Sequence, residues 1–266
     1  GMGQAASWNQ ITSRLDNQAG GTGTSMGFAD AGQPAQTTQT TEFKSAAYKN
    51  LGRDVEIGRQ LIASNKGANI EDVRAKQETI KTYEVLLGEE AMLMNGSAAA
   101  NSLEFDGLAK TIVTNSGTAA LITASGIGVH SRTLFGLGAE PTDLVINARQ
   151  NQALVDDLRG AGSSVDRVVI EQVGATVGGH VAKIVNPVTG SLVNVITSRY
   201  SFSWGYLLTV TSPAGENYIE VEDLEPLSVY DVPTSNHAVQ SRVFETSVLK
   251  VIGEVFQLKI GGLATS

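Results

Sequence analysis

The sequence predicts an α+β fold with one long helix and a predominantly antiparallel sheet. Residues 69–95 carry apolar side chains at helical spacing, without an interrupting proline. After residue 140 the chain becomes a series of short β-branched segments separated by turn residues. No repeat of about 20–50 residues is visible, which argues against a solenoid or a propeller.

Composition and length limit the class of protein. The chain has 266 residues, of which 41% are hydrophobic and 17% charged, as in a globular protein of two intertwined domains. No stretch reaches about 18 consecutive apolar residues, and no signal peptide precedes the fold, so we expect folding in a cytoplasm. Cysteine is absent, which excludes disulfides and thiolate metal sites. The net charge of −8 argues against a protein that reads nucleic-acid sequence.

The first 66 residues predict an arm followed by a long loop. Residues 1–24 combine a short apolar segment around Trp8 with a Gly/Thr run, as in a flexible arm. Residues 25–66 are polar and Thr-rich and include a strand-like run at 48–57, which favours a two-stranded, mostly solvated hairpin. Such a hairpin could reach on the order of 50 Å. Either it folds back on its own domain or lacks order, or it lies on a neighbouring copy.

Residues 69–95 form the clearest predicted helix. Asn69 is the expected N-cap, acidic residues occupy the first turn, and Gly96 follows the end. The length is about 40 Å at 1.5 Å per residue, enough for a spine across one domain. The alternative of a coiled coil is weakened because the pattern lasts only about three heptads. The predicted apolar stripe consists of Val73, Ile80, Tyr83, Leu87 and Met94.

The remaining elements follow from local patterns. A helix is expected over 126–137, and a second helix around 154–158 after the strand 143–147. Residues 186–190 have the composition of a hairpin turn between two strands. The expected strands are 143–147, 168–170, 181–185, 192–196, 206–210, 218–221, 239–251 and 255–260.

The usual signatures of catalysis and metal binding are absent from the sequence. His130, His180 and His237 lack a second ligand at metal-binding spacing, so structural roles are expected. Neither a GxSxG elbow nor a phosphate-binding P-loop occurs, and the glycines around 174–179 lack the GxGxxG spacing. The Glu89–Glu90 pair points in two directions about 100° apart on a helix, as on a solvated face. We therefore predict no catalytic, cofactor or metal site, and no enzyme.

The order of these parts resembles a known family. A polar arm, a Thr-rich hairpin, a spine helix ending in residues 89–96 (EEAMLMNG) and then residues 105–108 (FDGL) resemble the major capsid proteins of tailed bacteriophages. Residues 140–147 (EPTDLVIN), followed by a helix, resemble the start of that family's axial-domain sheet. The resemblance implies the Hong Kong 97-type capsid fold, with an N-arm, an extended β-hairpin loop, a long spine helix, and peripheral and axial domains.

The resemblance also implies a division of the chain and a set of contacts. Residues 1–24 would be the N-terminal arm and 25–66 the extended loop; 67–113 with 235–266 would form the peripheral domain, and 114–234 the axial domain. Some members cross-link a loop lysine to a neighbour's asparagine, but no such bond is predicted here. The residues expected to contact neighbouring subunits are Trp8, Arg14, Lys44, Lys49, Arg53 and Arg59. In a lone molecule, the loop charges would instead keep an exposed strand soluble.

The implied function is a shell. Copies of the chain would assemble as hexamers and pentamers around the double-stranded DNA of a tailed virus, without sequence-specific contacts and without a membrane. Expected partners are a portal, a scaffold or maturation protease, and decoration proteins; the expected location is the virion capsid, assembled in the host cytoplasm. An encapsulin-type nanocompartment is the alternative within the same fold. A small-molecule α/β enzyme and a secreted adhesion module are alternatives from other classes.

Overall fold

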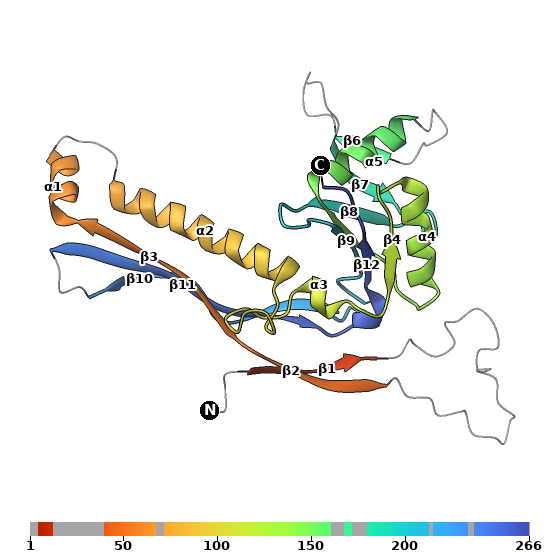
Figure 1. Cartoon of the computed structure of the whole chain (residues 1–266), viewed down its shortest axis with the longest axis horizontal. Coiled ribbons are helices and arrows are strands. Elements are labelled where there is room, and N and C mark those ends of the chain that lie inside the picture. Colours follow the sequence, from red (N-terminus) through yellow and green to blue (C-terminus); the bar gives the residue numbers. More distant parts are fainter. Residues whose placement is uncertain are drawn as a thin grey trace, which may run out of the picture. The chain divides into compact units, whose positions relative to one another are not determined.

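The computed structural model describes residues 5–12, 40–67, 72–160, 168–171, 180–212, 215–233 and 237–265 (Figure 1). They fall into two compact units. Unit 1 contains the described residues of Gly1–Ala6, Ser45–Gly107 and Val221–Lys250. Unit 2 contains those of Ser7–Lys44, Leu108–Glu220 and Val251–Ser266.

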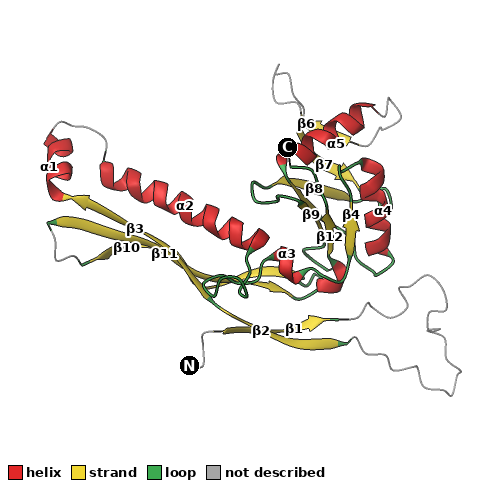
Figure 2. Cartoon of the chain, in the orientation of Figure 1, coloured by secondary structure: helices red, strands yellow, loops and turns green. Residues whose placement is uncertain are grey.

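The described residues combine helices and strands in both units, which confirms the mixed fold (Figure 2). The helices are α1 (Arg59–Gly67), α2 (Val73–Asn95), α3 (Leu108–Thr111), α4 (Ala124–Phe135) and α5 (Ala148–Gly160). The strands are β1 (Ala5–Ile11), β2 (Thr41–Ala47), β3 (Lys49–Gly58), β4 (Ser116–Thr118), β5 (Asp143–Ile146), β6 (Val168–Glu171), β7 (His180–Val185), β8 (Leu192–Thr197), β9 (Trp204–Leu208), β10 (Ile219–Val232), β11 (Ala238–Val251) and β12 (Leu258–Gly261).

Unit 1 is a long helix on a narrow sheet. The sheet has the strand order β10-β11-β3, and α2 packs against it. β3 is antiparallel to β11, with Gly58 opposite Ala238 and Lys49 opposite Ser247. The buried side chains of Leu51, Val85 and Val243 form one hydrophobic cluster between the helix and the sheet. Val85 is the one fully buried residue of α2, so much of the helix surface stays uncovered within the unit.

The ends of α2 follow from capping chemistry. The carboxylate of Asp72 accepts hydrogen bonds from the backbone N–H groups of Arg74 (3.0 Å) and Ala75 (3.3 Å), so Asp72, and not the expected Asn69, is the N-cap. The predicted end is confirmed, because the helix stops at Asn95 and Gly96 N–H donates to Met92 O at 2.8 Å.

Two glycines explain the motif that follows the helix. A Cβ on Gly96 would lie 2.4 Å from Phe105 O, and one on Gly107 would lie 2.3 Å from Met92 O. The backbone after α2 therefore turns back against the helix end so closely that only glycine fits. Asp106 completes the turn by accepting a hydrogen bond from Ala98 N–H at 2.9 Å.

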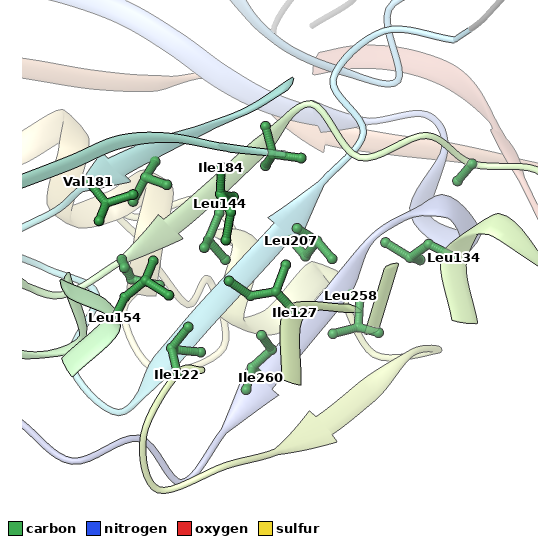
Figure 3. Close-up of a cluster of buried hydrophobic side chains, with 14 of the residues drawn as sticks. Ile122, Ile127, Leu134, Leu144, Leu154, Val181, Ile184, Leu207, Leu258 and Ile260 are labelled. Atoms are coloured by element: carbon green, nitrogen blue, oxygen red, sulfur yellow. The ribbon is translucent and has the colours of Figure 1, made fainter. Parts of the chain in front are cut away.

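Unit 2 is a seven-stranded mixed sheet with the order β4-β12-β9-β5-β8-β7-β6. Two of its strand pairs, β12 with β4 and β5 with β8, are parallel, and the others are antiparallel. One hydrophobic core joins α4 and α5 to this sheet (Figure 3). Its members include Ile122, Ile127, Leu134, Leu144, Leu154, Val181, Ile184, Leu207, Leu258 and Ile260.

The predicted hairpin of residues 181–196 is confirmed. β7 and β8 are antiparallel, and Gly190 adopts a left-handed φ of 77° in the turn. Asn186 stabilises that turn, because its Oδ1 accepts a hydrogen bond from Val188 N–H at 3.0 Å.

Glu254 holds the segment that leads from α3 to β4. This buried carboxylate accepts hydrogen bonds from the backbone N–H groups of Val113 (2.8 Å) and Thr114 (2.7 Å) and from the Thr114 hydroxyl (2.6 Å). Glu254→Ala leaves these donors without an acceptor and should lower stability by about 1–3 kcal/mol. Chemical denaturation of the unassembled chain measures this loss. The control Glu140→Ala, at an exposed position, should change little, and equal effects of the two variants would contradict the assigned role.

Two sequence expectations differ from the structure. Residues 49–58 were expected in a solvated hairpin with their own loop, but they pair with β11, and α1 follows them directly. Residues 13–39 lie outside the described residues. The compact units divide the chain at other positions than the expected domains: 221–233 fall in unit 1, and 251–265 fall in unit 2, where β12 pairs with β4 and β9. The division into arm, loop, peripheral and axial domains stays a prediction.

Candidate assembly surfaces

The outward side of α2 is apolar. Ile80, Tyr83 and Leu86 are 41%, 53% and 44% exposed, and their three-residue spacing places them along one side of the helix. The sheet side of α2 is formed instead by the turns that contain Val85 and Met92. Ile80, Tyr83 and Leu86 are called the outer stripe below.

The outer stripe shares two residues with the apolar stripe that the sequence predicts for this helix. Ile80 and Tyr83 lie on the side of α2 away from Val85 and the sheet. The other members of the predicted stripe, Val73, Leu87 and Met94, are partly buried. Apolar side chains at three-residue spacing on an exposed helix face are typical of an interaction surface.

The sheet of unit 1 has one face toward α2 and an opposite face that is partly exposed. Side chains alternate along β11, so Val243 points to α2 while Arg242 and Phe244 lie on the opposite side. Phe244 meets Tyr230 edge to face, with ring centroids 6.3 Å apart. Arg242 binds Asp54 of β3 through two hydrogen bonds of 2.6 and 2.8 Å. We call this side the outer sheet face; it offers aromatic and charged groups to solvent.

The Asp54–Arg242 pair should make stability depend on acidity. Hydrogen bonds from Arg242 are the main reason that the pKa of Asp54 lies below its ordinary value of 3.8. The pair therefore stabilises the folded chain above that value, and the contribution is lost as the pH falls through the lower folded pKa. In Asp54→Asn, melting temperatures between about pH 6 and about pH 3 should fall slightly less than in the wild type, because an exposed pair contributes little. An identical acid response of the two proteins would contradict this prediction.

A partly buried polar network links Tyr48, the residue before β3, to strands β10 and β11. The Tyr48 hydroxyl donates to Glu222 Oε1 at 2.5 Å, and Lys250 forms an ion pair with the same carboxylate. Hydrogen bonds from Lys250 and then Tyr48 lower the pKa of Glu222. No local sequence pattern indicates this network, because its three residues are far apart in the chain.

Among the residues predicted to contact neighbours, Trp8, Arg14 and Arg59 differ in their environments. Trp8 lies on β1, and its indole N–H donates to Val251 O at 3.2 Å within the same chain. Arg59 opens α1 with an exposed side chain. Arg14 lies outside the described residues. The apolar anchor predicted around Trp8 and Ile11 is confirmed in part, since Ile11 is buried in the core of unit 2.

Three of the four predicted loop cations contact a partner within the chain. Lys44 pairs with Glu42 at 3.0 Å on the same strand, and Lys49 Nζ donates to Ser102 O at 2.7 Å. Arg53 lies 3.8 Å from Glu84 of α2, at the limit of an ion pair. None of these contacts tests a meeting with a second copy, so the inter-subunit role of all six residues stays a prediction.

The histidines were expected in solvated or hydrogen-bonded structural roles. His130 is half-buried on α4, and burial lowers its pKa. Its ring lies against β4, where a Cβ on Gly117 would be 2.3 Å from His130 Cε1. His237 is exposed, and the side chain of His180 lies outside the described ones. No described helix has the length and apolar character that a membrane span requires.

Comparisons with known proteins agree on the fold alone. No protein-family model and no curated protein matches the sequence. Solved structures do match over nearly the whole chain, although the identity is low. The holo-SrpI encapsulin complex from Synechococcus elongatus PCC 7942 matches with a TM-score of 0.66 at 12% identity, covering 99% of this chain and 84% of that one.

Viral and virus-like shells match in the same way. The capsid of the cyanophage P-SCSP1u gives a TM-score of 0.60 at 11% identity, with 99% of this chain and 84% of that chain covered. The capsid of an empty GTA particle gives 0.58 at 12% identity, with 99% and 86% covered. At this low identity, the similarity lies in the fold and not in the sequence. The chain therefore has the Hong Kong 97-type fold that phage capsid and encapsulin shell proteins share.

Proposed function

We propose that this chain is the major capsid protein of a tailed virus, which assembles with many copies of itself into an icosahedral or prolate shell around double-stranded DNA. The observation that carries the proposal is the outer stripe: Ile80, Tyr83 and Leu86 are exposed on the longest described helix of a chain with a shell-protein fold. A structural role accounts for this surface without any catalytic site.

The energetics favour coverage by another subunit. Full burial of one large apolar side chain contributes roughly 1.5–3 kcal/mol, so a neighbour that covers the outer stripe gains several kcal/mol at one contact. The outer sheet face adds Tyr230 and Phe244, side chains of the aromatic kind enriched at interfaces. Because each subunit of a closed shell makes several such contacts, modest pairwise affinities add up to a stable particle.

The charge of the chain suits a genome container. A net charge of −8 repels a polyanion weakly, which allows packaged DNA to slide without sequence-specific contacts. Within this proposal the partners are hexamers and pentamers of the chain itself, a portal, a scaffold or maturation protease, and decoration proteins. The solved structure of Phage G capsid, which the chain also matches, contains decoration proteins beside the major capsid proteins. Assembly would take place in the host cytoplasm.

A second candidate is the shell of an encapsulin-type nanocompartment. The observation in its favour is the TM-score of 0.66 to the SrpI encapsulin, compared with 0.60 to the cyanophage capsid. Both candidates predict assembly through the same surfaces. They differ in the contents of the particle, which are double-stranded DNA in one case and a cargo protein in the other.

Sedimentation of the purified chain tests the proposal. With its scaffold or at high concentration, the chain should sediment as hexamer or pentamer rings or as large particles. Particles recovered from the natural source should contain nuclease-protected DNA. Protected protein cargo without DNA would favour the nanocompartment, and a monomer under all of these conditions would contradict both.

A further inference from the structure

Three carboxylates converge inside unit 1. Glu89 comes from α2, Asp223 from β10 and Glu245 from β11, and one oxygen from each lies within 4.8 Å of the other two. From their adjacent positions in the sequence, Glu89 and Glu90 are both predicted to lie on a solvated face. The structure separates the two residues, because Glu89 follows Val85 by one helical turn and therefore faces the sheet.

The three side chains form a graded path from solvent to the interior. Asp223 is exposed on the edge strand, Glu89 is partly buried, and Glu245 is only 5% exposed. Glu245 points to α2 because it follows Val243, a core residue, by two positions on the same strand. The cluster is therefore open to solvent at Asp223 and closed on the buried side at Glu245.

Two buried oxygens in this region have no hydrogen-bond partner of normal geometry. One is Oε2 of Glu245, although the neighbouring Glu89 carboxyl contributes to the raised pKa of Glu245. The hydroxyl of Ser247, which is fully buried, approaches Glu89 closely enough to lower its pKa, but the contact does not reach the geometry of a full hydrogen bond. Buried polar atoms are normally satisfied by protein, water or an ion, so both oxygens point to a missing ligand.

Among the described residues, no Lys or Arg forms an ion pair with these three carboxylates. Burial and the charges of Glu89 and Asp223 raise the pKa of Glu245 to about 7. Burial and the charge of Asp223 also raise the pKa of Glu89. The ion pairs found among the described residues involve other carboxylates, including Glu78, Glu84 and Glu222.

We propose that Glu89, Asp223 and Glu245 bind one hard divalent cation, Ca²⁺ or Mg²⁺. Carboxylate oxygens are the ligands that these ions prefer, and two oxygens on opposite sides of Ca²⁺ lie about 4.6–5.2 Å apart, which accommodates the observed spread. The Ser247 hydroxyl is close enough to Glu89 to support the ligand shell. The bound ion ties the helix α2 to two strands of the sheet beneath it, and this role is independent of what the chain assembles into.

Calorimetric titration tests the site on the full-length chain. The protein is freed of metal with a chelator and titrated with CaCl₂ or MgCl₂ at about pH 8, where carboxylates are ionised. The wild type should bind one ion per chain, and either ion should raise the melting temperature. Glu245→Gln and Asp223→Asn should weaken binding at least tenfold. Glu90→Gln is the matched control, because it removes one charge beside the site and should bind as the wild type does.

The titration distinguishes a bound cation from a proton that two of the carboxylates share. If Glu245 and Glu89 merely share a proton, neither ion binds saturably up to about 10 mM. This concentration lies above the dissociation constants of the weakest protein calcium sites. That result overturns the proposal, as does wild-type affinity in both site variants. Glu245→Gln should still fold, because it removes an unpaired buried charge; if it does not, Asp223→Asn at the exposed position decides.

Discussion

Replacing Tyr83 by aspartate is expected to leave the subunit folded and to abolish its assembly. Tyr83 is the most exposed member of the outer stripe and forms no side-chain hydrogen bond among the described residues, so its loss costs the lone chain little. In a shell the new carboxylate would be buried against a neighbour without a partner, which costs several kcal/mol at every copy of the contact. Circular dichroism should show a wild-type fold, and sedimentation should show only small species.

Tyr83→Phe is the control for this variant. It keeps the ring and removes only the hydroxyl, so it should assemble normally. Shells of wild-type size and yield from Tyr83→Asp would show that the outer stripe faces solvent in the particle, and would remove the main support for its role.

Replacing Phe256 by alanine is expected to give the largest loss of stability in unit 2. Phe256 is fully buried and stacks on Tyr218, with ring centroids 4.8 Å apart and planes inclined by 23°. It belongs to the same short 3-10 helix as Glu254, between β11 and β12. Truncation removes the ring and leaves a cavity, for which about 3–5 kcal/mol is typical.

Phe202→Ala is the matched control, because Phe202 is 55% exposed and meets Tyr200 only edge to face. Chemical denaturation of the unassembled chains should show a small change for Phe202→Ala and a large one for Phe256→Ala. A loss below about 1 kcal/mol for Phe256→Ala would mean that this part of the core relaxes to fill the space.

Local patterns predicted most of the individual elements. The spine helix, its end at Gly96, the hairpin around Gly190 and the strand 143–147 depend on helical or strand periodicity, on turn residues and on glycine. These signals lie within a few residues of one another, so one sequence is enough to read them. The order of elements then pointed to the correct fold.

Long-range pairing could not be read in the same way. Leu51, Val55 and Ile57 alternate with polar residues, which predicts a strand, here placed in a hairpin formed by residues 25–66. Alternation shows that one face of a strand is buried, but it does not identify the strand that pairs with it. β11, the actual partner, lies about 190 residues further along the chain.

The sequence also does not show which side of α2 packs on the sheet. Helical spacing groups Ile80 with Tyr83 but does not say whether that side faces the chain's own sheet or another molecule. The sheet side also carries Glu89, which a soluble monomer would be expected to keep in water. The acidic cluster was missed because its members come from three elements that are distant in sequence.

Electron microscopy of the purified chain is the most direct test of self-assembly. We expect closed particles or flat rings of five and six subunits, in which α2 of one copy lies against a neighbour through Ile80, Tyr83 and Leu86. Fields that contain only separate subunits at high concentration, with or without scaffold, would rule out a shell protein.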